Sequence, residues 1–564
     1  MKKTIISLSF ILLCGAASAQ GFDAGLLFSE NDYQGTARTM AMGNAFTALG
    51  GDLGSIGINP AGSAVARCYQ FTITPGLDFS LNGTKGSVTP DGMPSFQHKV
   101  RNGRTRFALP NLGISLNFNT GRRRGVMNWS LGFVINNTAQ YNSSPLALGT
   151  NNKTSANKTS AFGQMAARAQ DLAEDGYFTA ADLLDDSVYD KLAIEDWRVV
   201  TGFRSGAIAQ NGSSGKEFIG ISEYTGEDGK IKLGQNGIKQ AYGETTSGYK
   251  TDYIINAGMN ISDIVYLGIN LGAVRLRHKS DSYIQEEAVD PEDFDIVFTD
   301  NETGGTTVTH FISAKNTFSS STSGNGVYGK FGIIVTPYRG LRIGAAIQTP
   351  TMMFMASTYG VSSTAKYDLN AYSGYEEVES ATSHYQLRTP MRANFGIAWT
   401  FGGYGLISAD YELSDYSGIR YYENSNYRDD GPFYTLNEEI KSRCGVGHNF
   451  RIGGEIRPLS FMSVRAGYGF QTSGKRYEYS EDSLVKLNFK ELTVHTASVG
   501  LGFTTKGSFF ADIAAVGQIY PMQSLRPYAD YIYNPSTEAP YYYSPVIRYL
   551  RSSIKLVATF GWRF

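Results

Sequence analysis

Apolar and polar residues alternate with a period of two along most of the chain after Tyr69. In the first such stretch, Phe71, Ile73 and Leu77 fall on one face, whereas Thr72 falls on the other. Successive side chains of a β-strand point to opposite faces, so this period predicts strands with one apolar face. The pattern recurs in about 14 stretches, which begin near residues 69, 112, 127, 253, 265, 327, 341, 386, 404, 448, 461, 491, 508 and 551.

The connections between these stretches alternate between short and long. The long ones include segments at about 140–250 and 281–326, and the short ones are at 120–125, 262–264, 338–340, 402–403, 459–460 and 506–507. Short turns at one end and long loops at the other are typical of outer-membrane barrels. The pattern therefore predicts an all-β fold over residues 69–564, a transmembrane antiparallel β-barrel of about 14 strands with external long loops.

The two ends of the chain carry features typical of an exported barrel. Lys2 and Lys3, an uncharged run and Ala17-Ser18-Ala19 predict a signal peptide over residues 1–19. The final alternating stretch ends on Phe564. A terminal aromatic residue on an amphipathic strand resembles the signal that the barrel assembly machinery recognises, so that machinery is an expected partner.

Composition narrows the class further. The 564 residues include 64 Gly, 36 Tyr and 32 Phe, and the formal net charge is −1. Abundant aromatic residues and glycine suit a membrane barrel, and the near balance of charge gives no reason to expect a nucleic-acid partner. We expect a monomer in contact with outer-membrane lipid and lipopolysaccharide. After cleavage of the leader, Cys68 and Cys444 remain, and two thiols predict no disulfide framework.

The sequence contains no recognisable motif for catalysis or metal binding. The stretch Gly469 to Lys475 has the spacing of a phosphate loop, but Arg476 stands where a Ser or Thr should bind magnesium. The six histidines have no metal-ligand spacing, and the acidic residues at 290–295 lack the order of a calcium loop. We therefore expect no enzyme activity, no cofactor and no metal site, although a hydrolase assembled from distant residues stays an alternative.

Residues 20–68 have a different character. The segment from Gly35 to Ala64 is rich in glycine, has little charge beyond Arg38 and Asp52, and contains several large apolar side chains. Such glycine density favours close backbone packing and positive φ over a long helix. We predict a compact plug, or hatch, that the barrel encloses.

The hatch sequence resembles the N-terminal hatch of the FadL/TodX family of outer-membrane channels. The resemblance rests on Gly35-x-x-Arg38, Met42-Gly43-x-Ala45, Gly51-Asp52 and Asn59-Pro60-Ala61. It implies passive uptake of hydrophobic molecules, such as long-chain fatty acids or aromatic hydrocarbons, across the outer membrane of a Gram-negative bacterium. It also implies gating by the hatch, with Asn59, Pro60, Ala61, Gly43 and Arg38 as gating residues.

Two further groups of residues are candidates for binding a ligand. Met352, Phe354 and Met355 end one strand on the expected external side and suit varied apolar ligands, although packing at the barrel rim is an equal alternative. Arg388 and Arg392 lie on polar strand faces and should point into the lumen. An arginine there suits a carboxylate headgroup, whereas pairing with lumen carboxylates is the alternative role.

The sequence offers one candidate position for lateral release of cargo and leaves alternative functions open. Asn136-Asn137 interrupts an apolar strand, and we expect any lateral gap in the wall there. A general porin, or a receptor for another ligand such as haem, remains an alternative function.

Overall fold

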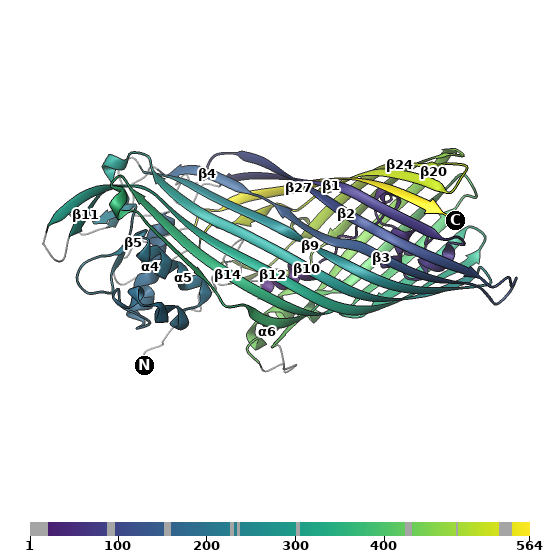
Figure 1. The fold of residues 1–564 in the computed structure, drawn as a ribbon, viewed down its shortest axis with the longest axis horizontal. Helices are drawn as coiled ribbons and strands as arrows, with labels where there is room; N and C mark the ends of the chain where they lie inside the picture. Colours follow the sequence, from purple (N-terminus) through teal and green to yellow (C-terminus); the bar gives the residue numbers. More distant parts are fainter. Residues whose placement is uncertain are drawn as a thin grey trace.

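A computed structural model of the chain describes residues 21–86, 96–151, 160–225, 231–233, 237–299, 305–423, 431–480, 483–528 and 544–564. The expected signal peptide lies outside these residues. Within them, the chain forms a closed barrel of 14 antiparallel strands, which confirms the predicted fold class. The barrel closes where β1 (Gln70–Gly86) pairs with β27 (Ile547–Arg563) (Figure 1).

The remaining strands follow one another around the wall in chain order. Several of them are interrupted and consist of separate segments, among them β13 with β14, β16 with β17, and β18 with β19. Pro350 and Pro390 lie at two of the interruptions. Proline has no N–H to donate to a neighbouring strand, so the pairing stops there. The bounds are β2 (Val100–Asn119), β3 (Val126–Ser143), β9 (Ile238–Ile261), β10 (Val265–Ala288), β12 (Thr306–Tyr338), β13 (Leu341–Gln348), β14 (Met352–Tyr367), β16 (Ser383–Arg388), β17 (Arg392–Thr400), β18 (Gly405–Asp415), β19 (Arg420–Glu423), β20 (Val446–Leu459), β21 (Met462–Thr472), β24 (Thr493–Thr504) and β25 (Phe509–Ile519).

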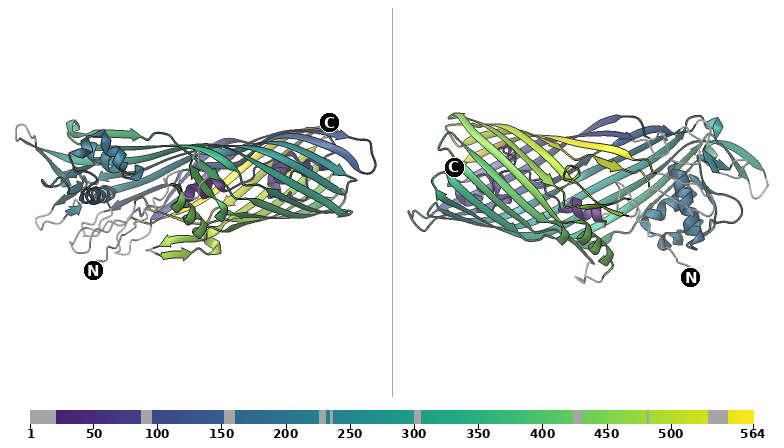
Figure 2. Two further views of the ribbon diagram at one scale, coloured as in Figure 1. Left: turned by 90° about the horizontal axis from the view of Figure 1, so that it is seen from below. Right: turned by 180° about the vertical axis from the view of Figure 1, so that it is seen from behind.

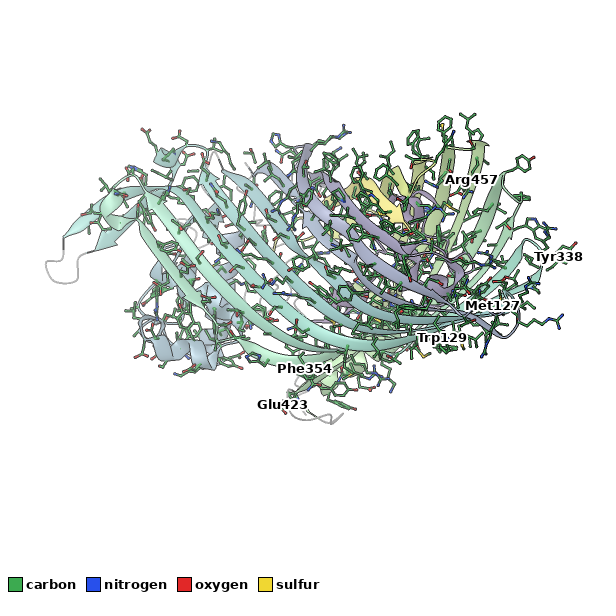
Figure 3. All side chains as sticks on the ribbon, turned by 45° about the vertical axis from the view of Figure 1, so that its right-hand side comes forward. Met127, Trp129, Tyr338, Phe354, Glu423 and Arg457 are labelled. Carbon is green, nitrogen blue, oxygen red and sulfur yellow. The ribbon has the colours of Figure 1, made fainter. Side chains whose placement is uncertain are left out.

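The outer face of the barrel is apolar. Exposed side chains such as Leu131, Ile255, Leu271 and Val327 point away from the lumen on successive strands. Near the short turns the exposed residues become aromatic, and Trp129 and Tyr338 are seen there in Figure 3. An apolar band with an aromatic girdle is the surface that a transmembrane barrel presents to lipid.

Several strands are much longer than a membrane requires. β10 has 24 residues and β12 has 33, whereas a tilted strand crosses a bilayer with about 9–11. The segment 281–326, which we expected to be a loop, is therefore largely strand: the end of β10, the short β11 (Asp295–Thr299) and the start of β12. Its outer face is rich in serine and threonine, so the hydrophobic alternation disappears there although the backbone ladder continues.

A helical cap, which we define as residues 160–225, packs against this extension of the wall. It contains α4 (Ala161–Glu174) and α5 (Trp197–Arg204), with the short helices η2 (Asp182–Leu184), η3 (Asp186–Lys191) and η4 (Ile194–Asp196) between them. Buried residues of α4 and α5 contact Phe311 and Tyr367 of the wall. The apolar face of α4 is therefore covered, and it does not form an open groove.

Smaller elements complete the described chain. They are the strands β4 (Leu146–Asn151), β5 (Ile208–Gln210), β6 (Phe218–Gly220), β7 (Glu223–Thr225), β8 (Ile231–Leu233), β15 (Gly374–Glu379), β22 (Tyr477–Ser480), β23 (Ser483–Lys486) and β26 (Gln523–Leu525), the short helices η5 (Pro291–Asp293), η6 (Asn370–Tyr372) and η7 (Tyr416–Gly418), and the helices α6 (Tyr434–Arg443) and α7 (Phe489–Leu492). No helix among the described residues has both the length and the apolar composition needed to cross a membrane.

The N-terminal segment, residues 21–68, lies inside the barrel (purple in Figure 2). It forms only short helices, namely α1 (Phe22–Ser29), α2 (Ala37–Ala41), η1 (Leu53–Gly57) and α3 (Gly62–Val65). Its buried apolar residues contact the inner face of the wall in several separate clusters. The predicted hatch is therefore a plug of tight turns and short helices.

Candidate functional site

The Asn59-Pro60-Ala61 turn is fixed to the barrel wall. The Asn59 amide nitrogen donates to the carbonyls of Thr47 (2.7 Å), Ile333 (3.2 Å) and Ala345 (3.4 Å). Its side-chain oxygen accepts from the backbone N–H of Ala61 at 3.1 Å. One fully buried side chain therefore joins two parts of the hatch to β12 and β13.

Glycines of the wall make room for the hatch backbone. A Cβ atom at Gly332 would lie 2.8 Å from Pro60 Cδ and closer still to the Asn59 side chain, and one at Gly396 would lie 2.8 Å from Thr47 Cβ. Such distances are shorter than carbon atoms tolerate. We call this set the glycine seat. Its members lie on β9, β10, β12, β13, β17, β20, β21 and β24, which follow one another around the wall except that β18 lies between β17 and β20, and they are Gly258, Gly268, Gly332, Gly344, Gly396, Gly453, Gly467 and Gly500.

Gly43 needs to be glycine for its own conformation as well. Its φ is +61°, which residues with a side chain rarely adopt. Its N–H donates to the Ser498 hydroxyl at 3.1 Å, and the same hydroxyl donates to the Ala41 carbonyl at 3.0 Å. Gly43 therefore lies directly against the wall at β24.

Arg38 belongs to a buried ionic network on the inner wall. Its Nε donates to Glu455 at 2.9 Å, and Arg465 contacts the same carboxylate at 2.7 Å and Asp512 at 2.5 Å. Most of these side chains are almost fully buried. Removal of one member would leave an unpaired charge inside the barrel, so the network holds α2 in one position.

The first helix of the hatch, α1, occupies an apolar chamber in the lumen. Phe22, Leu26 and Phe28 are buried among aromatic, methionine and aliphatic side chains. We define the chamber by the wall residues of this cluster, which are Ala139, Tyr141, Val274, Leu276, Tyr328, Met353, Met355, Tyr359, Tyr385, Leu387, Tyr416, Ile419 and Tyr421. The chain thus fills its own apolar space with its N-terminal helix.

Two cations bind the C-terminal end of α1. Lys250 donates to the carbonyl of Phe28 at 2.9 Å and to that of Glu30. Arg392 donates to the carbonyl of Ser29 and to the Glu412 carboxylate. Carbonyls at a helix C-terminus carry partial negative charge, so the chamber ends in a pair of buried cations that face the partially negative end of α1.

The wall is discontinuous beside the hatch. The ladder between β2 and β3 stops at the pair Asn111 and Asn136, although both strands continue. The hatch occupies the freed edge of β3, because the N–H groups of Asp32 and Gln34 donate to the carbonyls of Thr138 (2.7 Å) and Asn137 (3.0 Å). The interruption thus falls at the Asn136-Asn137 step noted in the sequence.

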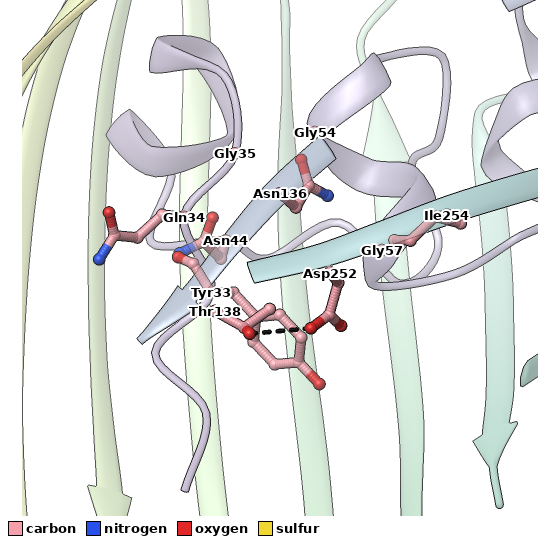
Figure 4. Close-up of a pocket in the computed structure, with 10 residues that line it drawn as sticks. All are labelled: Tyr33, Gln34, Gly35, Asn44, Gly54, Gly57, Asn136, Thr138, Asp252 and Ile254. Carbon is pink, nitrogen blue, oxygen red and sulfur yellow. Dashed lines mark hydrogen bonds between the residues drawn. The ribbon is translucent and has the colours of Figure 1, made fainter. Parts of the chain in front are cut away.

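A small polar cavity lies at this discontinuity (Figure 4). Its volume is about 10 Å³, and Tyr33 and Gln34 of the hatch face Asn136 and Thr138 of β3 across it. Thr138 donates to Asp252 at 3.0 Å at its side. A cavity of this size holds about one water molecule, so the hatch fills almost all of the space beside this discontinuity.

The ligand candidates from the sequence divide between the two faces of the wall. Met355 lies in the chamber, whereas Phe354 is 54% exposed and points outward (Figure 3), and Met352 shares its outer face. Arg392 is buried in the lumen, but Arg388 is exposed on the outside, against expectation. The apolar run at 352–355 has no polar member that would reveal which residues face the lumen.

Other residues of the site were not evident from the sequence. Lys250 follows a polar loop-like stretch, and nothing in its neighbourhood distinguishes it from a solvated lysine. The seat glycines are individually ordinary, but their recurrence on the inward face of neighbouring strands could have been noticed. Among the described residues, no group of His, Cys, Asp and Glu side chains is arranged to hold a metal ion.

Solved structures with a similar course of the chain include transport proteins. A FadL homologue from Pseudomonas aeruginosa aligns at 10% identity over 94% of this chain and 99% of its own, with a TM-score of 0.47. The toluene transporter TodX from P. putida aligns at 10% identity over 94% and 99%, with a TM-score of 0.48. The CymD monoaromatic hydrocarbon channel aligns at 10% identity over 94% and 97%, with a TM-score of 0.43. No family model and no curated protein matches the sequence.

Proposed function

We propose that this protein is an outer-membrane channel for the passive uptake of hydrophobic molecules that carry one anionic headgroup, such as long-chain fatty acids. The apolar outer band supports a position in a membrane. A polar outer leaflet slows the passage of such amphiphiles, and a channel for them needs an apolar binding site and a plug against leakage of polar solutes. The chamber and the hatch supply these two parts.

The observation that carries this proposal is the way α1 is bound. Its apolar side chains fill the chamber, and its terminal carbonyls lie on Lys250 and Arg392. An extended acyl chain with a carboxylate end presents the same two features in the same order. Arginine and lysine bind a carboxylate more strongly than a neutral carbonyl, so such a ligand competes with α1 for the chamber.

Displacement of α1 provides a route to gating. The arm, which we define as residues 21–34, is tied to β3 by the two backbone hydrogen bonds of Asp32 and Gln34. Each bond contributes about 1 kcal/mol in net terms, which binding energy in the chamber can offset. Loss of these bonds would open the cavity beside Asn136 and provide a lateral exit between β2 and β3.

Uptake into proteoliposomes tests the proposal. Radiolabelled oleate should enter faster than in protein-free vesicles, while glucose should not; rapid glucose uptake would instead favour a general porin. Lys250→Met should slow oleate but not the neutral oleyl alcohol, because only the anion uses the cationic end of the chamber. Lys279→Met, on the exposed side of neighbouring β10, is the matched control, and equal effects of both variants would contradict the proposed role of Lys250.

A further inference from the structure

A second break in the wall lies between β19 and β20. The ladder between β18 and β20 ends at the pair Asp415 and Val446, and β19 pairs with β16 alone within the described residues. The short helix α6 lies at this position on the flank of the barrel, between its two ends (Figures 1 and 2). A helix therefore replaces a segment of the strand wall beside the chamber.

One side chain attaches α6 to the free edge of β19. The Asn437 carboxamide accepts from the N–H of Tyr421 at 2.8 Å and donates to the Tyr421 carbonyl at 2.9 Å. These two bonds satisfy the backbone groups that a neighbouring strand would otherwise bind. The C-terminal end of α6 is held separately, because the Arg443 carbonyl accepts from the Arg476 N–H at 2.8 Å. Along β19, however, the attachment of α6 is local and depends on Asn437.

The inner side of α6 touches the helix that occupies the chamber. Ile440 belongs to the apolar cluster around α1, and the Arg443 guanidinium lies 3.9 Å from the centre of the Phe22 ring. Cys444, at the end of α6, is also buried in this cluster. Among the described residues α6 covers this side of α1, so movement of α6 would uncover the chamber sideways.

Two arginines lie on the outer face beside this break. Arg388 of β16 and Arg420 of β19 are directly opposite each other, and both side chains face outward. Among the described residues neither has a carboxylate within ion-pair distance, and Arg420 donates only to the carbonyls of Ser417 (2.6 Å) and Ile419 (2.7 Å). Like charges directly across two strands are destabilising, unless an anion lies between them.

We infer that α6 is a side door to the chamber and that Arg388 and Arg420 bind the carboxylate of an incoming anionic amphiphile beside it. The inference rests on the proposed function, since it supplies the route by which the same cargo reaches the chamber. The forked donors of two arginines suit one carboxylate. The headgroup is held at the surface while the apolar chain passes under α6 to the place that Phe22 and Leu26 now occupy.

Cys444 reports the position of the door. Burial raises the pKa of its thiol to about 12, so the closed protein should react slowly with a maleimide. In a Cys68→Ser background, Asn437→Ala should accelerate labelling of Cys444 without ligand and raise the initial rate of oleate uptake at least about threefold, because both bonds to Tyr421 are lost. Asn437→Asp keeps an acceptor for the Tyr421 N–H, so its rates of labelling and of uptake should lie between those of Asn437→Ala and of the parent protein. Glu438→Ala, on the solvent side of α6, is the control.

A comparison of an anionic with a neutral ligand tests the role of Arg388 and Arg420. Arg388→Gln combined with Arg420→Gln should slow oleate uptake at low concentration and leave oleyl alcohol uptake unchanged. Faster labelling of Cys444 in Asn437→Ala without faster oleate uptake would overturn the side door, and equal slowing of both ligands would overturn the headgroup site. Failure of the parent protein itself to take up oleate would instead contradict the proposed function.

Discussion

Replacement of Gly332 by alanine tests whether the glycine seat fixes the hatch. The new methyl carbon would lie 2.8 Å from Pro60 Cδ and would overlap the Asn59 side chain. Both neighbours belong to a buried turn, so neither can rotate away as the end of a flexible side chain could. The hatch turn must therefore lift from β12, or the strand must shift.

The expected magnitude follows from the strain of the added methyl group on a turn that several bonds hold. Lifting it breaks the hydrogen bonds of Asn59 to the carbonyls of Ile333 and Ala345 and the bond from Asn256 to the Pro60 carbonyl (3.0 Å). At about 1 kcal/mol each, these contribute about 3 kcal/mol, and strain from overpacking is of the order of 1–3 kcal/mol. The bonds hold the turn equally in both proteins, so only the strain shifts the equilibrium. Since each 1.4 kcal/mol is a factor of ten, strain of this size should raise the population with a displaced hatch by about 5- to 100-fold.

Gly329 on the same strand gives a matched control. An added Cβ there meets only Thr349 Cγ2, at 3.9 Å, which is ordinary contact. We expect Gly332→Ala to leak a small hydrophilic dye from proteoliposomes much faster per folded molecule, and Gly329→Ala to behave as the parent protein. Folded protein is quantified by heat-modifiable migration in electrophoresis. Equal leakage of the two variants, with normal amounts of folded protein, would refute a structural seat.

Three other predictions concern the gate, assembly and topology. Asn59→Ala with Pro60→Ala should leave the barrel folded and change hydrophobic uptake per folded molecule, because the turn loses its bonds to β12 and β13; unchanged uptake per molecule would remove the gating role. Deletion of Phe564 or Phe564→Asp should reduce the amount of folded barrel in the outer membrane, since deletion removes the backbone bonds to Tyr69 at the closure (3.0 and 3.1 Å) and Asp replaces the exposed terminal aromatic with a charge; normal amounts of both variants would disprove this. Protease added to intact cells should cut within the long 142–245 region and spare the turn at Arg122 to Arg124, which lies at the opposite end of the barrel from α4 and α5 (Figure 1); cleavage at the turn alone would invert the topology.

The sequence predicts the transmembrane part of this fold well, because lipid on the outside forces an apolar residue at every second position. Leu131 and Phe133 on β3 are examples, and all 14 strands are detected in this way. Beyond the membrane that constraint is lost. Ser319 and Ser321 on β12 pair regularly with β10 and β14, yet with water on the outer face their sequence resembles a loop.

The site is predictable only where a local backbone requirement leaves a trace in the sequence. Gly43 needs a positive φ, and Asn59 needs a turn with proline, so both positions are conspicuous. The outward position of Arg388 depends on the interruption after β16 at Pro390, which resets the register between β16 and β17. Register across an interruption is set by pairing with neighbouring strands and not by the residues themselves.

The contacts of the N-terminal segment divide it into two parts with different freedom. Residues 35–65 lie backbone to backbone against wall glycines and are held by bonds to many strands, such as the bond from Thr47 N–H to Asp410 at 2.7 Å and that from Ala37 N–H to Thr559 at 2.7 Å. The arm is held by two backbone bonds to β3, by Lys555 and Gln518 at Asp32, and by contacts around α1 that an amphiphile can replace. Displacing the first part breaks many bonds together, whereas displacing α1 exchanges its contacts in the chamber for equivalent ones with cargo. Ligand-driven opening should therefore begin in the arm, with the seated part as the fixed floor that keeps polar solutes out.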